Sequence, residues 1–214
     1  TLGNLVNRTI SMSNKYFDGV VTNTGVAEEV DEDLKAVVLG TADKVSAKMD
    51  QLRVADAMTE IFALFKRCNK YIDETMPWAL AKDEAKKDRL ATVLYNLVEG
   101  ISIGASLLES FMPETAQKVV AQLNTTLRSL DETKTFGLYP SGNKVVEKPE
   151  ILFARLDVNE VLEKVAAKKA AEEAANHVPT VEIESYEEAN LDFETFCKSD
   201  FRAVKVKECS EVKK

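Results

Sequence analysis

The sequence predicts an all-α protein, an antiparallel bundle of about five helices, from two observations. Apolar residues recur at helical spacing along most of the chain up to Leu123, and the joints between these segments are short. Beyond the bundle this helical periodicity is lost, and the later segments have different patterns. We therefore divide the chain into a helical bundle, an extended return segment, a charged helical or flexible linker and the incomplete start of a further domain, over residues 1–136, 137–157, 158–190 and 191–214.

The first two predicted helices are amphipathic. Leu2 to about Phe17 carries apolar residues at helical spacing and ends near Gly19. Asp31 and Asp33 place negative charge at the start of the second helix, where the helix dipole favours it.

Two long apolar helices follow. The third predicted helix begins near Val54, and the fourth runs from about Glu84 to Phe111. Gly100 and Gly104 in the latter permit close approach of a neighbouring helix, and Pro113 opens a fifth helix to about residue 123.

The joint between the third and fourth helices holds the single tryptophan of the chain, Trp78, directly after Pro77. Proline keeps Met76 out of the right-handed α region and favours the first turn of a helix. We expect Trp78 just inside a new helix whose first N–H groups are unpaired, a spot suited to a planar, hydrogen-bonding ligand.

The segments after the bundle have weaker patterns. We expect the extended apolar segment Lys148–Leu156 to pack against a body outside this sequence, and residues 157–176, rich in Ala, Lys and Glu, to form a solvated helical linker. Near the end, 191–199 is helix-like, and Val204 and Val206 alternate with lysines as in a strand.

Composition excludes several classes of protein. With 28 Lys plus Arg against 36 Asp plus Glu, the charge of −8 argues against indiscriminate binding to nucleic acid or anionic membranes. The three cysteines form no CxxC pair, which favours a reduced, cytoplasmic setting without a zinc knuckle. The apolar helix is interrupted by Asn96, Glu99 and Glu109, so we expect no membrane span.

No catalytic constellation is present. His177, the single histidine, lies in a polar stretch typical of a solvated side chain, and the many carboxylates are expected on solvated helix faces. Asn4 and Arg8 project side by side from one helix and could read a nucleotide that stacks on Trp78. The alternative is that Asn4 and Arg8 are merely solvated while Trp78 fills a corner of the core.

Two pairs of motifs carry a family resemblance. Leu2–Arg8 with Asn14–Gly19, and Asn69–Glu74 with Pro77–Lys82, resemble the anticodon-binding domain of bacterial methionyl-tRNA synthetase, a class I aminoacyl-tRNA synthetase. The resemblance extends to Ile151–Arg155, where the family more often has a proline in place of alanine. The tail from Asp192 is similar to the opening of the family's appended tRNA-binding OB-fold, although Phe201 stands where the family usually has leucine.

The resemblance implies specific roles. Trp78, preceded by Pro77, would stack on the cytosine of the CAU anticodon of methionine tRNA, while Asn4 and Arg8 would bond anticodon bases or phosphates. Asn69 and Asp73 would lie near the same pocket and order Trp78 and Arg8, or alternatively cap the helix joint.

The family's ATP-binding signatures do not occur in this sequence. We therefore expect a fragment that neither activates methionine nor charges tRNA, with no cofactor of its own; the ATP, magnesium and any zinc of the parent ligase would belong to an upstream catalytic domain. Expected partners are the methionine tRNA anticodon loop and that domain, with homodimerisation of the parent through the OB-fold. A helical protein-interaction or dimerisation module without RNA specificity is the alternative.

Overall fold

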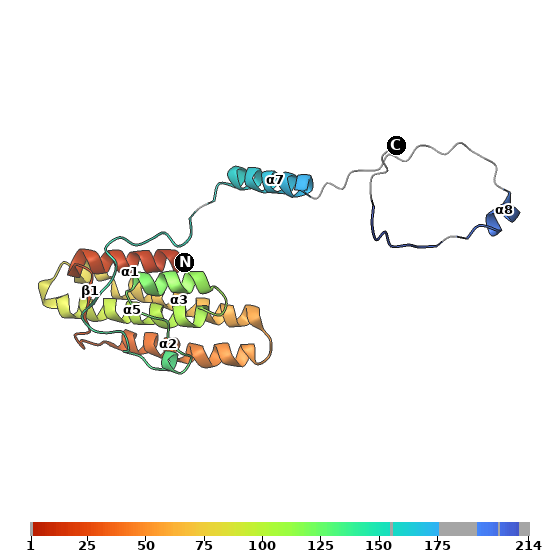
Figure 1. Cartoon of the computed structure of the whole chain (residues 1–214). Coiled ribbons are helices and arrows are strands. Elements are labelled where there is room, and N and C mark those ends of the chain that lie inside the picture. The colour runs from red at the N-terminus through yellow and green to blue at the C-terminus, as the bar shows by residue number, and fades with distance from the viewer. Residues whose placement is uncertain (1, 155, 176–191, 201, 210–214) are drawn as a thin grey trace. The chain divides into compact units, whose positions relative to one another are not determined.

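The computed structural model describes residues 2–154, 156–175, 192–200 and 202–209. The chain divides into two compact units, residues 1–155 and 156–214. The first unit is a bundle in which long helices run side by side (Figure 1). The predicted all-α bundle is confirmed. Its α-helices are α1 Leu2–Phe17, α2 Glu29–Met49, α3 Val54–Thr75, α4 Pro77–Leu80, α5 Lys87–Leu108 and α6 Pro113–Gln122.

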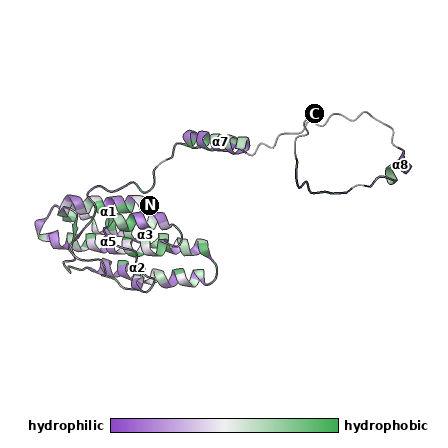
Figure 2. Ribbon diagram, in the orientation of Figure 1, coloured by the Kyte–Doolittle hydropathy of each residue, from purple (hydrophilic) through white to green (hydrophobic). Residues whose placement is uncertain are grey.

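Helices α1, α2, α3 and α6 have apolar and polar faces, and their apolar residues form one core (Figure 2). Helix α5 lies at the centre of this core and is buried along nearly its whole length. Among the described residues, one stretch, Glu84–Leu108, is long and apolar enough to cross a membrane, but its apolar window is 100% buried in the bundle. It has the character of a core helix.

The predicted close approach to α5 is confirmed on its α3 side. A Cβ atom added to Gly104 would lie 2.5 Å from Phe65 Cε1, and one added to Gly100 would lie 3.1 Å from Cys68 Sγ. Because non-bonded carbons need about 3.5–4.0 Å, only glycine at position 104 allows this packing.

Short connections complete the first unit. Two 3₁₀ turns, Glu84–Lys86 and Glu132–Lys134, precede α5 and follow α6. Strands β1 Val20–Val21 and β2 Asn143–Lys144 pair antiparallel. Sequence analysis missed this two-residue sheet because so short a strand has no periodicity to detect.

The segment that follows α6 packs on the bundle as far as Leu152. Tyr139 is buried, and its hydroxyl donates a hydrogen bond to the Leu123 carbonyl at 2.7 Å. Leu152 packs against the bundle's own core, whereas Ile151 is 72% exposed. The expectation that all of 148–156 packs against an outside body is therefore wrong for Leu152, whose apolar side chain finds its partner within this unit.

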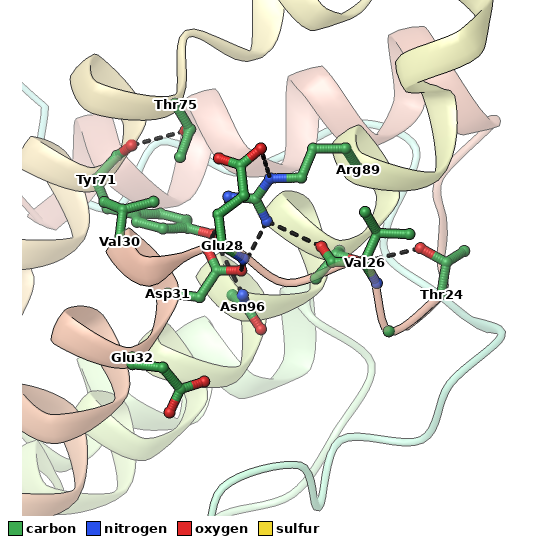
Figure 3. A network of polar contacts seen from close by, with 12 residues as sticks. Thr24, Val26, Glu28, Val30, Asp31, Glu32, Tyr71, Thr75, Arg89 and Asn96 are labelled. Carbon is green, nitrogen blue, oxygen red and sulfur yellow. Dashed lines mark hydrogen bonds and ion pairs between the residues drawn. The ribbon is translucent and has the colours of Figure 1, made fainter.

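A buried ion pair joins α2 to α5 (Figure 3). Arg89 donates from Nη1 and Nη2 to the two carboxylate oxygens of Asp31 at 2.7 and 2.8 Å, and both side chains are buried. The Tyr71 hydroxyl donates to the same carboxylate at 2.5 Å, and Asn96 donates to that hydroxyl. Burial raises the pKa of Asp31, but the hydrogen bonds from Arg89 and Tyr71 outweigh it and hold that pKa below its ordinary value.

A second buried carboxylate organises the long connection after α6. Glu99 accepts hydrogen bonds from Nη1 and Nη2 of Arg128, at 2.8 and 2.7 Å, and from the backbone N–H groups of residues 137, 138 and 139. The expectation that the carboxylates lie on solvated faces is therefore wrong for Asp31 and Glu99. For Glu99, a single acid within the apolar stretch 90–108 is the sequence signal that indicates a buried, paired group, whereas Asp31 lies among other acids and gives no such signal.

The second unit contains α7 Val158–Ala175 and α8 Phe193–Cys197. The described part of the expected solvated linker is helical, with α7 exposed except at the partly exposed Val161. The expected strand at Val204 and Val206 is not formed, and both side chains are exposed, since a strand without a neighbour has no partners for its backbone groups. His177 and the rest of 176–191 lie outside the described residues.

Candidate nucleic-acid interface

The joint that carries Trp78 is set by an unusual backbone conformation. Helix α3 ends at Thr75, and Met76 adopts φ 45° and ψ 64°, in the left-handed region. Pro77 is buried at the first position of α4. The proline thus keeps Met76 out of the right-handed region, as the sequence predicts. The reversal leaves Trp78 44% exposed, so the alternative that it fills a corner of the core is wrong.

The expectation of free N–H groups at this joint is also wrong for two of them. Helix α4 has only 4 residues, and the N–H groups of Ala79 and Leu80 both donate to the Met76 carbonyl, at 2.8 and 3.2 Å. The exposed indole of Trp78 is therefore a more accessible part of this joint than these two amides.

Trp78 forms one wall of a groove against the outer face of α1. The groove has a volume of about 260 Å³. It mixes aromatic, aliphatic, amide, hydroxyl and cationic groups, and its lining residues are Asn7, Arg8, Ser11, Met12, Lys15, Tyr16 and Trp78. The structure thus places Arg8 and Trp78 together although 69 intervening residues separate them in the sequence.

Arg8 is the partly sheltered cation of the groove. Its side chain is 35% exposed, and its Nη2 lies 4.0 Å from Asp73 Oδ1 on α3. A pair at this distance with an exposed carboxylate is weak, because water competes for both charges. The guanidinium therefore remains available to an incoming acceptor.

The other predicted site residues, Asn4, Asn69 and Asp73, do not line this groove. Asn4 is exposed one turn before Arg8 and does not line the groove. Asn69 is half-buried, and its amide donates to the Phe65 carbonyl of its own helix at 2.9 Å. Asp73 approaches Arg8, as the ordering role requires. The roles of these residues toward RNA stay predictions.

Sequence reasoning missed the part of the groove that α1 supplies after Arg8. Met12, Lys15 and Tyr16 follow Arg8 at intervals of four, seven and eight residues, which places them on one helix face. The Lys15 ammonium lies 5.4 Å from the Tyr16 ring centroid. Helical spacing from Arg8 is the signal that would have found all three.

Among the described residues, no group of three or more His, Cys, Asp or Glu could hold a metal ion. The groove instead presents an exposed aromatic plane beside a guanidinium and an amide. A helical domain with such a surface has the groups that proteins use to recognise single-stranded nucleic acids. In that mode, bases stack on aromatic rings and polar groups hydrogen-bond to the base edges.

Comparison with known proteins identifies the family. Residues 21–174 match the model of the anticodon binding domain of methionyl tRNA ligase. The chain is 44% identical over 213 residues to a methionine–tRNA ligase of Clostridium perfringens, covering 100% of this chain and 33% of that protein. A Caldanaerobacter subterraneus methionine–tRNA ligase is 44% identical over 195 residues, covering 89% of this chain and 30% of that protein.

Solved structures agree with this match. Apo Mycobacterium tuberculosis methionyl-tRNA synthetase superposes with a TM-score of 0.67 at 29% identity, covering 73% of this chain and 32% of that one. Its methionyl-adenylate complex gives a TM-score of 0.66 at 31% identity, over 72% of this chain and 30% of that one. The chain belongs to the methionyl-tRNA ligase family and contains its anticodon-binding domain. It spans about a third of the length of the curated relatives it matches.

Proposed function

We propose that this chain recognises the CAU anticodon of methionine tRNA, as the non-catalytic part of a methionine–tRNA ligase that joins methionine to tRNA with ATP. The full activity would require a catalytic domain that supplies the sites for ATP and Mg²⁺. The single observation that carries the proposal is the 44% exposed Trp78 in a groove with Arg8, within a domain of this family.

The first anticodon base, cytosine, would stack on the indole of Trp78. An aromatic side chain stacked on a base contributes about 1–3 kcal/mol, and stacking does not depend on net charge. This supports RNA binding by a chain whose formal charge is −8. Pro77 would act through the backbone by holding Trp78 at the start of α4.

Arg8 would supply the polar contact to the stacked nucleotide. Its guanidinium donors can reach the carbonyl oxygen of cytosine or a phosphate, exchanging the weak contact with Asp73 for a shorter one. Asn4, exposed one helical turn earlier, would contact the neighbouring part of the loop. Asp73 would orient Arg8, and Asn69, bonded within α3, would support the surface beneath it.

The test is a titration of the full chain with RNA stem-loops whose loops carry CAU or UAU. We expect CAU to bind more tightly, and Trp78→Ala to weaken binding of CAU by about 1–3 kcal/mol. Arg8→Ala should weaken binding and reduce the preference for cytosine if Arg8 contacts the base edge. Equal binding of the two loops would contradict the proposal, as would unchanged affinity of Trp78→Ala.

The proposal places the full protein in the cytoplasm, where tRNA is charged. Homodimerisation through the C-terminal segment is a separate prediction. Light scattering on the full chain and on a version ending near residue 150 tests it. If a dimer forms and persists in the shorter chain, the segment is not its cause.

A further inference from the structure

The last turn of α3 carries charges that its position disfavours. Helix α3 ends at Thr75, and its last turn contains Asp73 and Glu74 but no basic residue. The C-terminal end of a helix has a partial negative charge and is stabilised by cations, so the two acids favour fraying of this turn. The turn leads directly into the joint that holds Trp78. Positive groups from outside the turn must therefore compensate for the carboxylates.

Glu74 finds two cations on its own helix. Arg67 Nη1 donates a hydrogen bond to Glu74 Oε2 at 2.8 Å, and the Lys70 ammonium lies 3.3 Å from Glu74 Oε1. The side chain of Arg67 is 12% exposed and that of Glu74 is 31% exposed, whereas that of Lys70 is 71% exposed. Because water competes for exposed charges, the sheltered and shorter contact is the stronger one. Arg67 is therefore the main partner of Glu74.

Arg67 also reaches the neighbouring helix. Its Nη2 donates a long hydrogen bond of 3.4 Å to the Val30 carbonyl in the first turn of α2, and its guanidinium carbon lies 6.0 Å from the Tyr71 ring centroid. Tyr71 donates to Asp31 on α2, and the Thr75 hydroxyl donates to the Tyr71 carbonyl at 2.7 Å (Figure 3). The last turn of α3 is thus braced against the first turn of α2.

We propose that Arg67 and Glu74 are positioning residues for Trp78, because their pair holds the last turn of α3 and so fixes the indole in its groove. The inference rests on the proposed function and extends it to two residues that do not line the groove. Met76, between Glu74 and Trp78, has a left-handed backbone conformation. A non-glycine residue keeps this conformation only where the surrounding structure enforces it. If the turn before it frays, Met76 can leave this conformation and the indole changes orientation.

The opposite charges of the two side chains separate positioning from simple attraction to RNA. RNA is a polyanion, so loss of a positive charge on the protein weakens its binding and loss of a negative charge strengthens it. A purely electrostatic role therefore predicts weaker RNA binding by Arg67→Met and stronger binding by Glu74→Gln. The positioning role predicts weaker binding by both variants, because each substitution breaks the same pair.

The first measurement needs no RNA. Trp78 is the single tryptophan of the chain, so the anisotropy of tryptophan fluorescence reports the mobility of this indole. We expect lower anisotropy in Arg67→Met and Glu74→Gln, measured where circular dichroism shows each variant folded, and Arg67→Lys should keep most of the original value. Arg53→Met is the matched control, because it removes an arginine–carboxylate pair with Asp56 at the other end of α3 and should leave the anisotropy unchanged. A merely structural role would lower the free energy of unfolding without changing the anisotropy of the folded chain.

The second measurement is titration of the full chain with the CAU stem-loop. Arg67→Met and Glu74→Gln should each bind about threefold to tenfold more weakly, since a displaced indole loses part of its stacking on the base, while Arg53→Met should bind like the unmodified chain. Unchanged anisotropy in both variants would overturn the inference, as would stronger binding by Glu74→Gln. Equal binding of CAU and UAU loops by the unmodified chain would instead contradict the proposed function, and the anisotropy would still decide whether the pair positions Trp78.

Discussion

Two arginine–aspartate pairs in the first unit differ in burial and geometry. Arg89 binds Asp31 through two hydrogen bonds of 2.7 and 2.8 Å in the interior, whereas Arg8 lies 4.0 Å from an exposed Asp73. The buried pair has additional partners, since Tyr71 also donates to its carboxylate and Arg89 also donates to the Val26 carbonyl at 3.2 Å. The same two residue types thus form a fixed support in one place and an exchangeable contact in the other.

The difference follows from solvation. In the interior, a charge without its partner cannot be stabilised by water, so the pair is held strongly once formed. At the surface, water stabilises each charge separately and the pair contributes little. A ligand can therefore displace Asp73 from Arg8 at small cost, whereas separating Asp31 from Arg89 would leave two buried charges without partners.

The largest expected effect is on the buried pair. Arg89→Ala leaves Asp31 charged and buried and should lower the free energy of unfolding by about 3–5 kcal/mol. Urea denaturation of the variant measures this loss. The matched control is Arg8→Ala, which should change the free energy of unfolding by less than about 0.5 kcal/mol. Similar losses in the two variants would contradict the comparison.

The second-largest expected effect is a loss of stability at low pH, where protonation of Asp31 weakens its pair with Arg89. Because the folded-state pKa of Asp31 is below its ordinary value, its contribution to stability is present above about pH 4 and is lost as pH falls through the lowered pKa. Denaturant titrations between pH 7 and pH 2 measure the slope. Asp31→Asn should show a smaller loss of stability over that acid range, and an unchanged slope would mean that other carboxylates account for it.

Trp78→Ala should separate binding from folding. Since the side chain is 44% exposed, its removal should lower the free energy of unfolding by less than removal of a fully buried aromatic residue, for which about 3–5 kcal/mol is typical. The loss of affinity for the CAU stem-loop should be about 1–3 kcal/mol. Phe65→Ala, at a buried position on α3, is the control that should lose most in stability.

The smallest effect is expected for Asp73→Asn. It removes the weak contact with Arg8 and should change the free energy of unfolding by less than about 0.5 kcal/mol. If Asp73 orients Arg8 for RNA, the affinity for CAU should still fall measurably in the titration. No change in either quantity would assign Asp73 to a solvated surface position.

The amino-acid sequence determined the helices of the first unit through local signals. Periodicity predicted α1 and α3, and the proline at position 113 predicted the start of α6. Gly100 and Gly104 predicted the close approach of a neighbouring helix, which the structure identifies as α3. These signals are local because a helix forms from contacts between residues three or four positions apart. A glycine likewise leaves space for a neighbouring helix because it has no side chain. Two separated motifs also sufficed to indicate the family.

Only the tertiary structure decided which charged residues are buried and which surfaces meet. In the sequence, Asp31 and Asp73 look alike, since each is an aspartate within a helical segment. Their environments differ because different parts of the chain pack against them. The exposure of Trp78 likewise depends on where α4 lies against the bundle. Local spacing cannot encode these contacts, because they join residues whose separation in sequence is unrelated to their distance in space.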